Sequence, residues 1–437
     1  MQVSCNYKCK LVAIILLKST QELYKKTKYV MNTLIKVDLN AKPEEQDIMH
    51  NRWHPDIPMV AMVDPGDEFR VECVDWTGGQ VANTDDASDI KYVDLSKVHY
   101  LSGPIGVRGA EPGDLLAVDI LDVGMLEDSL WGFTGIFAKE NGGSFLVDHY
   151  PEARKTCWDY HGIKTTSRHI PGVEFAGIRH PGLIGTLPSK ELLEEWNKRE
   201  KELFDTNPDR VPALCTLPYA DTAHMGRMGS AEAAEAAKEA ARTVPPREHG
   251  GNCDIKDLSR GSKVYFPVYV KDGGLSMGDC HFSQGDGEIT FCGGIETAAY
   301  VDVRVNLIKN GVAQYGIKNP IFEPSPSDPN YSNYIIFEGI SVDESGKQHY
   351  MDTTIAYRQA VLNCIEYLKK FGYTGEQIYS LLSSAPVEGH ISGIVDIPNA
   401  CATLFLPTDI FDFNIRPEPG GPKVSIPTGT DVAKALS

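Results

Sequence analysis

Gly-Asp-Cys-His-Phe-Ser-Gln-Gly-Asp-Gly-Glu at residues 278–288 follows a predicted strand, and Gly-Gly-Asn-Cys-Asp at residues 250–254 precedes that strand. Glycines crowd the whole stretch from residue 250 to 296, and carboxylates, amides and one histidine lie between them. Glycine permits backbone conformations and close approaches that a Cβ atom forbids. Carboxylates and a histidine on such loops are typical of a metal site or of general acid/base catalysis. The alternative interpretation is a series of turns between strands, where Gly and Asp are common for conformational reasons.

Strands are predicted on both sides of this stretch. Apolar residues alternate with charged ones at residues 68–73 and at 301–307, which is the period-two pattern of a half-buried strand. Asp-Pro-Gly-Asp at residue 64 and Glu-Pro-Gly-Asp at residue 111 each form a turn before a strand, the second strand spanning 115–123. Two such turns favour a β-sandwich or barrel over a βαβ unit. Because it contains Pro267, the segment 263–270 is predicted to be an edge strand or a bulged one.

Helices are predicted in the middle and near the end of the chain. Ser189 is a candidate N-cap for a helix over 190–204, and an alanine-rich helix is expected over 230–242. Towards the C-terminus, Asp352 is expected to cap an amphipathic helix that Gly372 ends. Thr374 and Gln377 form a capping box for a shorter helix to about residue 384, and one buried strand is expected over 391–405.

These patterns predict an α+β, β-rich fold, with β-sandwich or barrel-like sheets, a C-terminal α/β portion and a helical insertion on the surface. Arg179-His-Pro-Gly is assigned to a loop. Six divisions are expected. They are an N-terminal extension (1–30), a β-rich N-terminal part (31–189), the helical insertion (190–247), a β-rich part with the functional loops (248–345), the α/β portion (346–415) and a Pro/Gly-rich tail that is ordered only in part (416–437).

Composition limits the classes of partner. The formal net charge of the 437-residue chain is -18, which argues against nucleic acid and anionic membrane surfaces, because both require basic patches. The 10 cysteines are scattered and form no C-x-x-C pair, as expected for a reducing cytosol, so a cytoplasmic location is predicted. The apolar run at 11–17 is too short to span a membrane, and Met31 is the expected natural start, with residues 1–30 as a dispensable extension.

Two histidines in the N-terminal part have spacing that a metal site would use. His50 and His54 lie four residues apart, which places two side chains on one face of a helix. Pro55 and Pro58 argue against a helix there, so structural roles are favoured.

Three motifs in this order resemble the formamidase/acetamidase family. They are Gly-Pro-Ile-Gly-Val-Arg-Gly-Ala-Glu-Pro-Gly-Asp at 103–114, the Gly-Gly-Asn-Cys-Asp segment and the segment at 278–288, and the resemblance covers roughly residues 31–420. The segment around His99 and the long middle insertion resemble the formamidase branch in its fungal form. The resemblance implies hydrolysis of formamide to formate and ammonia, a β-rich fold with a C-terminal α/β portion, a homo-oligomer and dependence on a metal, with no organic cofactor.

The residues themselves suggest how an amide is hydrolysed. Asp279 and His281 are two apart, so in an extended segment both side chains point to one face and can reach one cation. Asp254 is the expected third ligand of a divalent metal, for which zinc is a candidate. Glu288 or Glu111 is the candidate general base. Candidate donors to the developing oxyanion are Asn252 and Gln284.

Two other amidase chemistries and one non-enzymatic role remain open at this stage. Residues 274–278 match the nucleophile-elbow pattern of serine hydrolases around Ser276, although that motif requires a helix after the serine. Cys253 and Cys280 lie beside the candidate acids and could serve a thiol-dependent amidase. The same acidic loops could also bind a metal or another ligand without catalysis.

Overall fold

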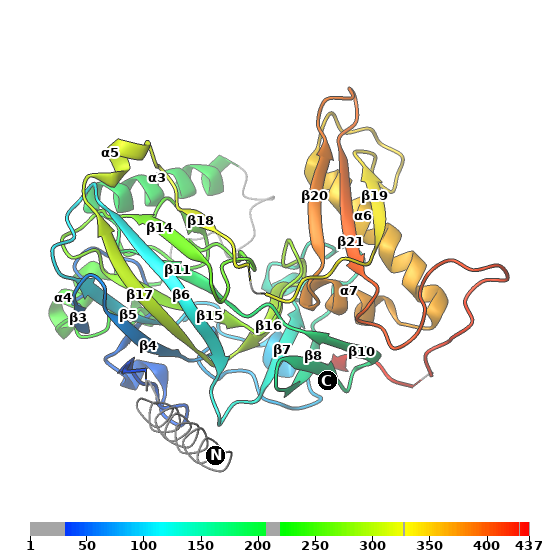
Figure 1. Cartoon of the computed structure of the whole chain (residues 1–437), viewed down its shortest axis with the longest axis horizontal. Coiled ribbons are helices and arrows are strands. Elements are labelled where there is room, and N and C mark those ends of the chain that lie inside the picture. Colours follow the sequence, from blue (N-terminus) through cyan, green and yellow to red (C-terminus); the bar gives the residue numbers. More distant parts are fainter. Residues whose placement is uncertain (1–30, 207–218, 327, 428, 437) are drawn as a thin grey trace, which may run out of the picture.

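The computed structural model describes residues 31–206, 219–326, 328–427 and 429–436, so the predicted extension at 1–30 lies outside the described residues. Two large sheets form the β-rich part (Figure 1). The first sheet has six strands in the order β1 (Thr33–Ile35), β4 (Glu68–Cys73), β17 (Ala299–Ile308), β6 (Leu115–Met125), β14 (Lys263–Pro267) and β18 (Ile321–Glu323).

The second sheet has thirteen strands. Its main path runs β10 (Ile170–Ala176), β9 (Lys164–Ser167), β8 (Arg154–His161), β7 (Trp131–Ile136), β16 (Phe291–Thr297), β15 (Leu275–His281), β11 (His180–Gly185), β13 (Gly250–Asn252) and β12 (Pro246–Arg247). The short strands β2 (Met49–His50), β3 (Ala61–Val63) and β22 (Ala433–Lys434) join it through β5 (Leu101–Val107) and β8. Neither sheet closes into a barrel over the described ranges, so the sandwich alternative is the correct one.

One apolar core lies between the two large sheets. It combines Val71 of β4, Val118 of β6 and Val303 of β17 with Ile105 of β5 and Met277 of β15, all buried. The alternation predicted at 68–73 is visible as strictly alternating burial of β4. The sandwich predicted from the two Pro-Gly-Asp turns is therefore confirmed.

A second core lies under the C-terminal unit. Here β19 (Tyr334–Ile340), β21 (Cys401–Pro407) and β20 (Glu388–Gly393) form a three-stranded sheet that packs on α6 (Thr353–Leu368). This helix and α7 (Gly375–Ser384) share a core with Trp158 of β8 and with Phe282, which directly follows β15. In Figure 1 the C-terminal unit stands beside the sandwich, and β16, β7 and β8 lie between them.

The helix ends agree with the capping residues. The Asp352 side chain accepts a hydrogen bond from the backbone N–H of Ile355, and Gly372 adopts the left-handed conformation after the last turn. Thr374 and Gln377 form the predicted capping box of α7. In the insertion, α3 (Lys190–Thr206) matches its prediction, whereas α4 (Ser230–Ala236) is shorter than expected.

Several local predictions are wrong. The strand expected over 391–405 is a hairpin of β20 and β21, because a turn at 394–400 interrupts it. Strand β14 is not an edge, since it pairs with both β6 and β18, and its Pro267 is the last residue. The expected boundary after residue 345 falls inside the C-terminal unit, because β19 is the first strand of its sheet. The tail contributes β22 to the large sheet.

No helix of the described residues is long and apolar enough to cross a membrane.

Candidate active site

The candidate site lies where the two cores meet, at the end of β15. Cys280 belongs to the sandwich core and Phe282 to the core under the C-terminal unit, and His281 lies between them. Around His281 gather four carboxyl groups, from Asp254, Asp279, Glu288 and Glu296; these five residues are called the His281 cluster. The ligand atoms of Asp254, His281 and Glu288 lie within 4.8 Å of one another, as do those of Asp279, His281 and Glu296.

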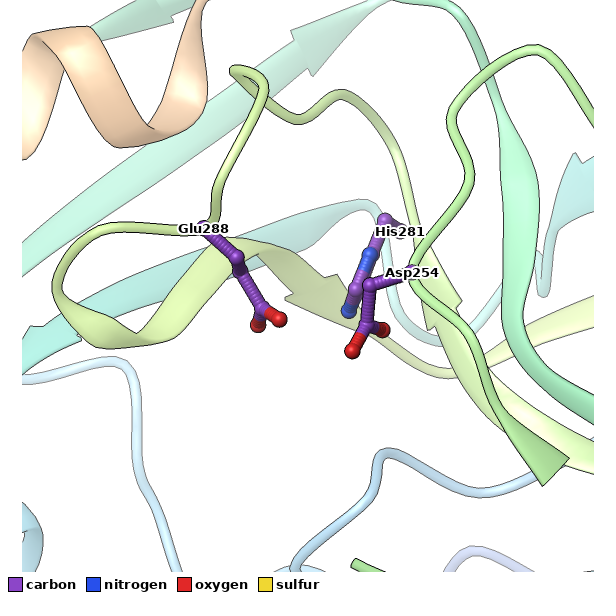
Figure 2. Close-up of side chains that lie close together, drawn as sticks. All are labelled: Asp254, His281 and Glu288. Atoms are coloured by element: carbon purple, nitrogen blue, oxygen red, sulfur yellow. The ribbon is translucent and has the colours of Figure 1, made fainter. Parts of the chain in front are cut away.

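Figure 2 shows how three members of the cluster converge. The carboxyl groups of Asp254 and Glu288 come from different loops and point towards the same space, with the His281 ring beside Asp254. Asp254 and Glu288 are partly exposed, whereas Asp279, His281 and Glu296 are buried. The cluster therefore has an outer pair of carboxyl groups and an inner pair behind them.

Backbone conformation marks the same residues. Asp254, Asp279 and Glu288 have φ angles of 49°, 51° and 46°, in the left-handed region that few non-glycine residues adopt. Such conformations cost free energy and persist where the surrounding structure enforces them, often at functional sites. Asp279 is in the middle of a strand, so its conformation interrupts the regular pairing of β15 with β11.

Glycines give the cluster its space. A Cβ atom on Gly182 of β11 would lie 2.6 Å from Asp254 Oδ1 and 2.9 Å from His281 Cε1. On Gly294 of β16 it would lie 2.6 Å from His281 Cγ. The backbone N–H groups of Cys253 and Asp254 both donate to the Gly182 carbonyl, which anchors the loop that carries Asp254.

The two nitrogens of His281 have different surroundings. Nδ1 lies 3.0 Å from Gln284 Oε1, to which it can donate, and the Gln284 amide nitrogen donates to the Asp254 carbonyl at 2.7 Å. Nε2 lies 2.9 Å from Glu296 Oε2 and 3.4 Å from Asp279 Oδ1. His281 Nε2, Glu296 Oε2 and Asp254 Oδ1 make no hydrogen bond within the described residues.

Burial and the neighbouring charges shift the pKa values of the cluster. Burial raises the pKa of Asp254 well above its usual range, and the neighbouring Glu288 and Asp279 raise it further. Burial also raises the pKa of Glu288, and raises that of Glu296 to about 8. Burial alone would lower the pKa of His281, but the charges of Glu296 and Asp279 raise it well above its usual value. In contrast, the His281 and His99 charges outweigh burial and lower the pKa of Asp279 to about 2.

This donor set fits a divalent cation. Four carboxylates close to one imidazole carry an excess of negative charge. That charge must be removed by protonation or compensated by a cation. A metal-ligating histidine usually donates from one ring nitrogen to a carbonyl or carboxylate oxygen and leaves the other nitrogen for the metal, and His281 can do so with Nδ1 and Nε2. Nitrogen and oxygen ligands suit zinc among other metals.

Not all predicted site residues are brought together. The expected ligand trio of Asp254, Asp279 and His281 is divided, since Asp254 groups with Glu288 and Asp279 groups with Glu296. Glu111 is exposed in the turn before β6, beside the last residues of β5. Because β5 and β15 are antiparallel, this turn lies at the end of β15 that is remote from His281, so the structure does not support Glu111 as a general base.

The two predicted oxyanion donors have other contacts. Gln284 holds His281 and Asp254 in place, so its position indicates an orienting role. The Asn252 amide donates to the Val244 carbonyl, and its Oδ1 has no hydrogen-bond partner among the described residues. Asn252 lies in β13 opposite Leu183, two residues before Asp254.

The rival nucleophiles are poorly placed. Ser276 is fully buried inside β15, with no helix after it, and its hydroxyl donates to Nε2 of the equally buried His50 at 2.8 Å. The structural role predicted for His50 is consistent with this contact. Burial raises the pKa of the Cys253 thiol to about 12, and contact with Cys73, together with burial, raises that of Cys280. A raised pKa disfavours the thiolate that a nucleophile requires, so the surroundings of both thiols argue against this role.

Sequence reasoning missed three residues near the cluster. Glu296 ends the glycine-rich stretch but was given no role, although a carboxylate there was a visible signal. His180 was assigned to a loop, whereas it begins β11 opposite His281 and lies 3.3 Å from His281 Nδ1. His99 Nε2 lies 3.9 Å from Asp279 Oδ2. Nothing local in the sequence links His99 or His180 to residue 281.

Comparison with known proteins supports the resemblance. The sequence profile described as the Acetamidase/Formamidase family matches residues 36–413. A formamidase of Methylophilus methylotrophus is 70% identical over 404 residues, covering 92% of this chain and 99% of that protein. An acetamidase of Mycolicibacterium smegmatis is 56% identical, covering 78% of this chain and 86% of that protein.

A solved structure agrees with the whole architecture. The structure described as a gamma lactamase from Delftia acidovorans superimposes with a TM-score of 0.91 and 65% identity, covering 93% of this chain and 99% of that chain. The fold prediction is confirmed, and the similarity to bacterial proteins extends the resemblance beyond the fungal form. Because the family profile matches residues 36–413, the chain belongs to the acetamidase/formamidase family of amide hydrolases.

Proposed function

We propose that this chain hydrolyses formamide, and other short aliphatic amides, to the carboxylic acid and ammonia at the His281 cluster. The observation that carries the proposal is the convergence of four carboxyl groups on one buried histidine, three of them on left-handed backbone. The 70% identity to a formamidase supports formamide as the substrate.

A divalent cation is part of the proposal. The inner residues Asp279, His281 and Glu296 would hold it, because their ligand atoms lie within 4.8 Å of one another and His281 Nε2 faces Glu296 Oε2 at 2.9 Å. A divalent cation supplies Lewis acidity, which polarises an amide carbonyl and lowers the pKa of water. This proposal replaces the expected ligand Asp254 with Glu296.

The outer carboxyl groups are left for proton transfer. Burial raises the pKa values of both Asp254 and Glu288; the Glu288 charge raises that of Asp254 further, whereas the contact with Asp254 lowers that of Glu288, so Asp254 is the better proton donor of the pair and Glu288 the better acceptor. Amide hydrolysis requires a base that takes a proton from water and an acid that returns one to the leaving nitrogen. Glu288, which is partly exposed and is held by the Gly293 N–H at 3.0 Å, is the proposed base.

The rest of the chain positions these groups. Gln284 fixes the His281 ring by accepting from Nδ1, and it fixes the Asp254 loop by donating to its carbonyl. Gly182 and Gly294 leave the volume that side chains would fill. Cytoplasmic location and homo-oligomeric assembly stay predictions that accompany this function.

The test is release of ammonia and formate from formamide, with acetamide as second substrate. We expect His281→Ala to abolish both products, and Glu111→Gln to retain the wild-type rate because Glu111 is exposed and remote from the cluster. A wild-type protein that releases no ammonia from either amide, or a His281→Ala variant that is fully active, would contradict the proposal.

A second candidate activity is hydrolysis of cyclic amides. The solved structure at 65% identity is described as a gamma lactamase, and it covers almost the whole chain. Ring opening of a five-membered lactam uses the same base and the same carbonyl activation but releases no ammonia. Measurement of the amino acid formed from the lactam therefore separates this activity from formamide hydrolysis, and His281→Ala should abolish both if one site serves them.

A further inference from the structure

The end of the helical insertion reaches the candidate site. After α4, the chain pairs with the N-terminal part through Ala241 and Trp53, whose backbone groups exchange two hydrogen bonds at 2.9 and 3.0 Å. Two residues later, the hydroxyl of Thr243 accepts the backbone N–H of His99 at 2.6 Å. Thr243 is fully buried. The insertion is therefore joined to the residue that faces the inner carboxylate Asp279.

The Thr243 hydroxyl also contacts the His99 ring. Its Oγ1 lies 3.2 Å from His99 Nδ1. Since Oγ1 already accepts the backbone N–H, its own hydrogen is available, and a buried hydroxyl needs an acceptor for it. Within the described part of the chain, Nδ1 is the acceptor that the Thr243 hydroxyl contacts. Nδ1 is then unprotonated, and the proton of the neutral ring is on Nε2.

The other nitrogen faces the site. His99 Nε2 lies 3.9 Å from Asp279 Oδ2, and the ring is held by Trp76 at a centroid distance of 5.3 Å. A gap of this length is too wide for a direct hydrogen bond, and the oxygen atom of a water molecule can bridge it by accepting from Nε2–H and donating to the carboxylate. A fixed N–H directed at such an oxygen stabilises negative charge that develops on it.

We infer that Thr243 is a positioning residue: it holds His99 in the tautomer whose Nε2–H faces the reacting oxygen beside Asp279. The helical insertion thereby supplies one wall of the site. This inference rests on the proposed amide hydrolysis for its kinetic consequence, but the tautomer of His99 can be measured without any activity.

The first test is kinetic. Thr243→Val keeps the shape and removes the hydroxyl, so we expect kcat for formamide to fall about tenfold, the loss associated with one misdirected hydrogen bond, with little change in KM. Thr243→Ser restores the hydroxyl and should recover most of the rate. The matched control is Thr222→Val, since the Thr222 hydroxyl also ties the insertion to the body, through Arg52 and the Ser96 carbonyl, without touching His99.

A double-mutant cycle separates positioning from general destabilisation. The amide of Gln in His99→Gln needs no tautomer, so Thr243→Val should cost much less in that background. Equal losses in both backgrounds, or an equal loss in Thr222→Val, would overturn the inference. Thermal unfolding of each variant checks that the fold is intact.

The second test is independent of turnover. Nitrogen-15 NMR of histidine-labelled protein, with the His99 signals assigned by their loss in His99→Gln, should show the Nε2–H tautomer in the wild type and a mixture in Thr243→Val. An Nδ1–H tautomer in the wild type contradicts the inference, even if formamide proves not to be the substrate. Absence of ammonia from a wild type that has the Nε2–H tautomer contradicts the proposed function instead.

Discussion

Buried charge occurs in two very different settings in this protein. Lys155, which is fully buried, pairs with Asp89 at 2.6 Å and donates to the Ala82 carbonyl and the Thr84 hydroxyl. In the His281 cluster, four carboxyl groups surround one histidine, and three polar atoms have no hydrogen-bond partner among the described residues. Burial alone therefore does not mark a functional site. Unbalanced charge, polar atoms without partners and left-handed backbone at the same residues do mark one.

The largest expected effect is a fall in kcat when a carboxylate of the His281 cluster is removed. We expect Glu288→Gln to lower kcat by roughly 10²–10⁴-fold, the range for loss of a general base. The thermal unfolding midpoint should stay the same or rise, because one of several crowded carboxylates is neutralised. Formamide kinetics and calorimetry of the same preparation measure both. A large fall in the midpoint would mean that Glu288 belongs to the balanced, structural class.

The balanced Lys155–Asp89 pair should respond in the opposite way, with a loss of stability and no change in kcat. Asp89→Ala leaves Lys155 buried without its carboxylate, which should lower the free energy of unfolding by about 3–5 kcal/mol. The kcat of the protein that remains folded should not change. Glu174→Ala is the control, because the Lys164–Glu174 pair is about half exposed and should contribute at most about 1 kcal/mol. Urea unfolding compares the variants, and equal losses would remove the distinction between buried and exposed pairs.

A glycine substitution probes the space in the cluster. In Gly182→Ala the new methyl group would lie 2.6 Å from Asp254 Oδ1 and 2.9 Å from His281 Cε1, so both side chains must move. We expect a fall in kcat that exceeds the fall in stability. Gly393→Ala is the matched control, since the nearest atom to its Cβ, on Asp396, is 3.7 Å away. Wild-type activity in Gly182→Ala would show that Asp254 and His281 need not keep their positions.

The smallest expected effect is on the pH dependence of stability at Glu248, which contacts helix α3 of the insertion. Hydrogen bonds from Arg199 lower the pKa of Glu248 from 4.5 to about 2, despite partial burial that raises it, and Trp196 adds a hydrogen bond at 2.8 Å. A lowered pKa gives stability that is present above the unfolded value of 4.5 and is lost as the pH falls towards 2. The stability difference between wild type and Glu248→Gln should therefore shrink across that window. A difference that stays constant would show that the charge of Glu248 is irrelevant.

Local signals in the sequence predicted local structure well. The cap at Asp352, the left-handed Gly372 and the capping box of Thr374 and Gln377 each depend on residues within one helical turn, and the structure contains all three. The hairpin at 388–407 was missed because Ile and Val continue through the turn at 394–400, although Asp396-Ile-Pro-Asn was a visible turn signal.

The site required long-range information. Asp254, Asp279, His281 and Glu288 were found because they share one glycine-rich stretch. His180 joins them only through the register of β11 on β15, and His99 only through β5 and the returning insertion. Glu111 was selected because it lies in a family-like motif, and the antiparallel pairing of β5 with β15 places it at the wrong end. Sheet register was not readable from the sequence.

The central claim is that the inner residues of the His281 cluster hold a divalent cation on which amide hydrolysis depends. The most direct measurement is ammonia release from formamide by exhaustively chelated protein, as zinc and other divalent metals are titrated back with bound metal measured in parallel. The account predicts that activity disappears on chelation and returns in proportion to one bound cation per chain, and that Glu296→Gln binds the cation more weakly. Full activity in protein that contains no metal would contradict it.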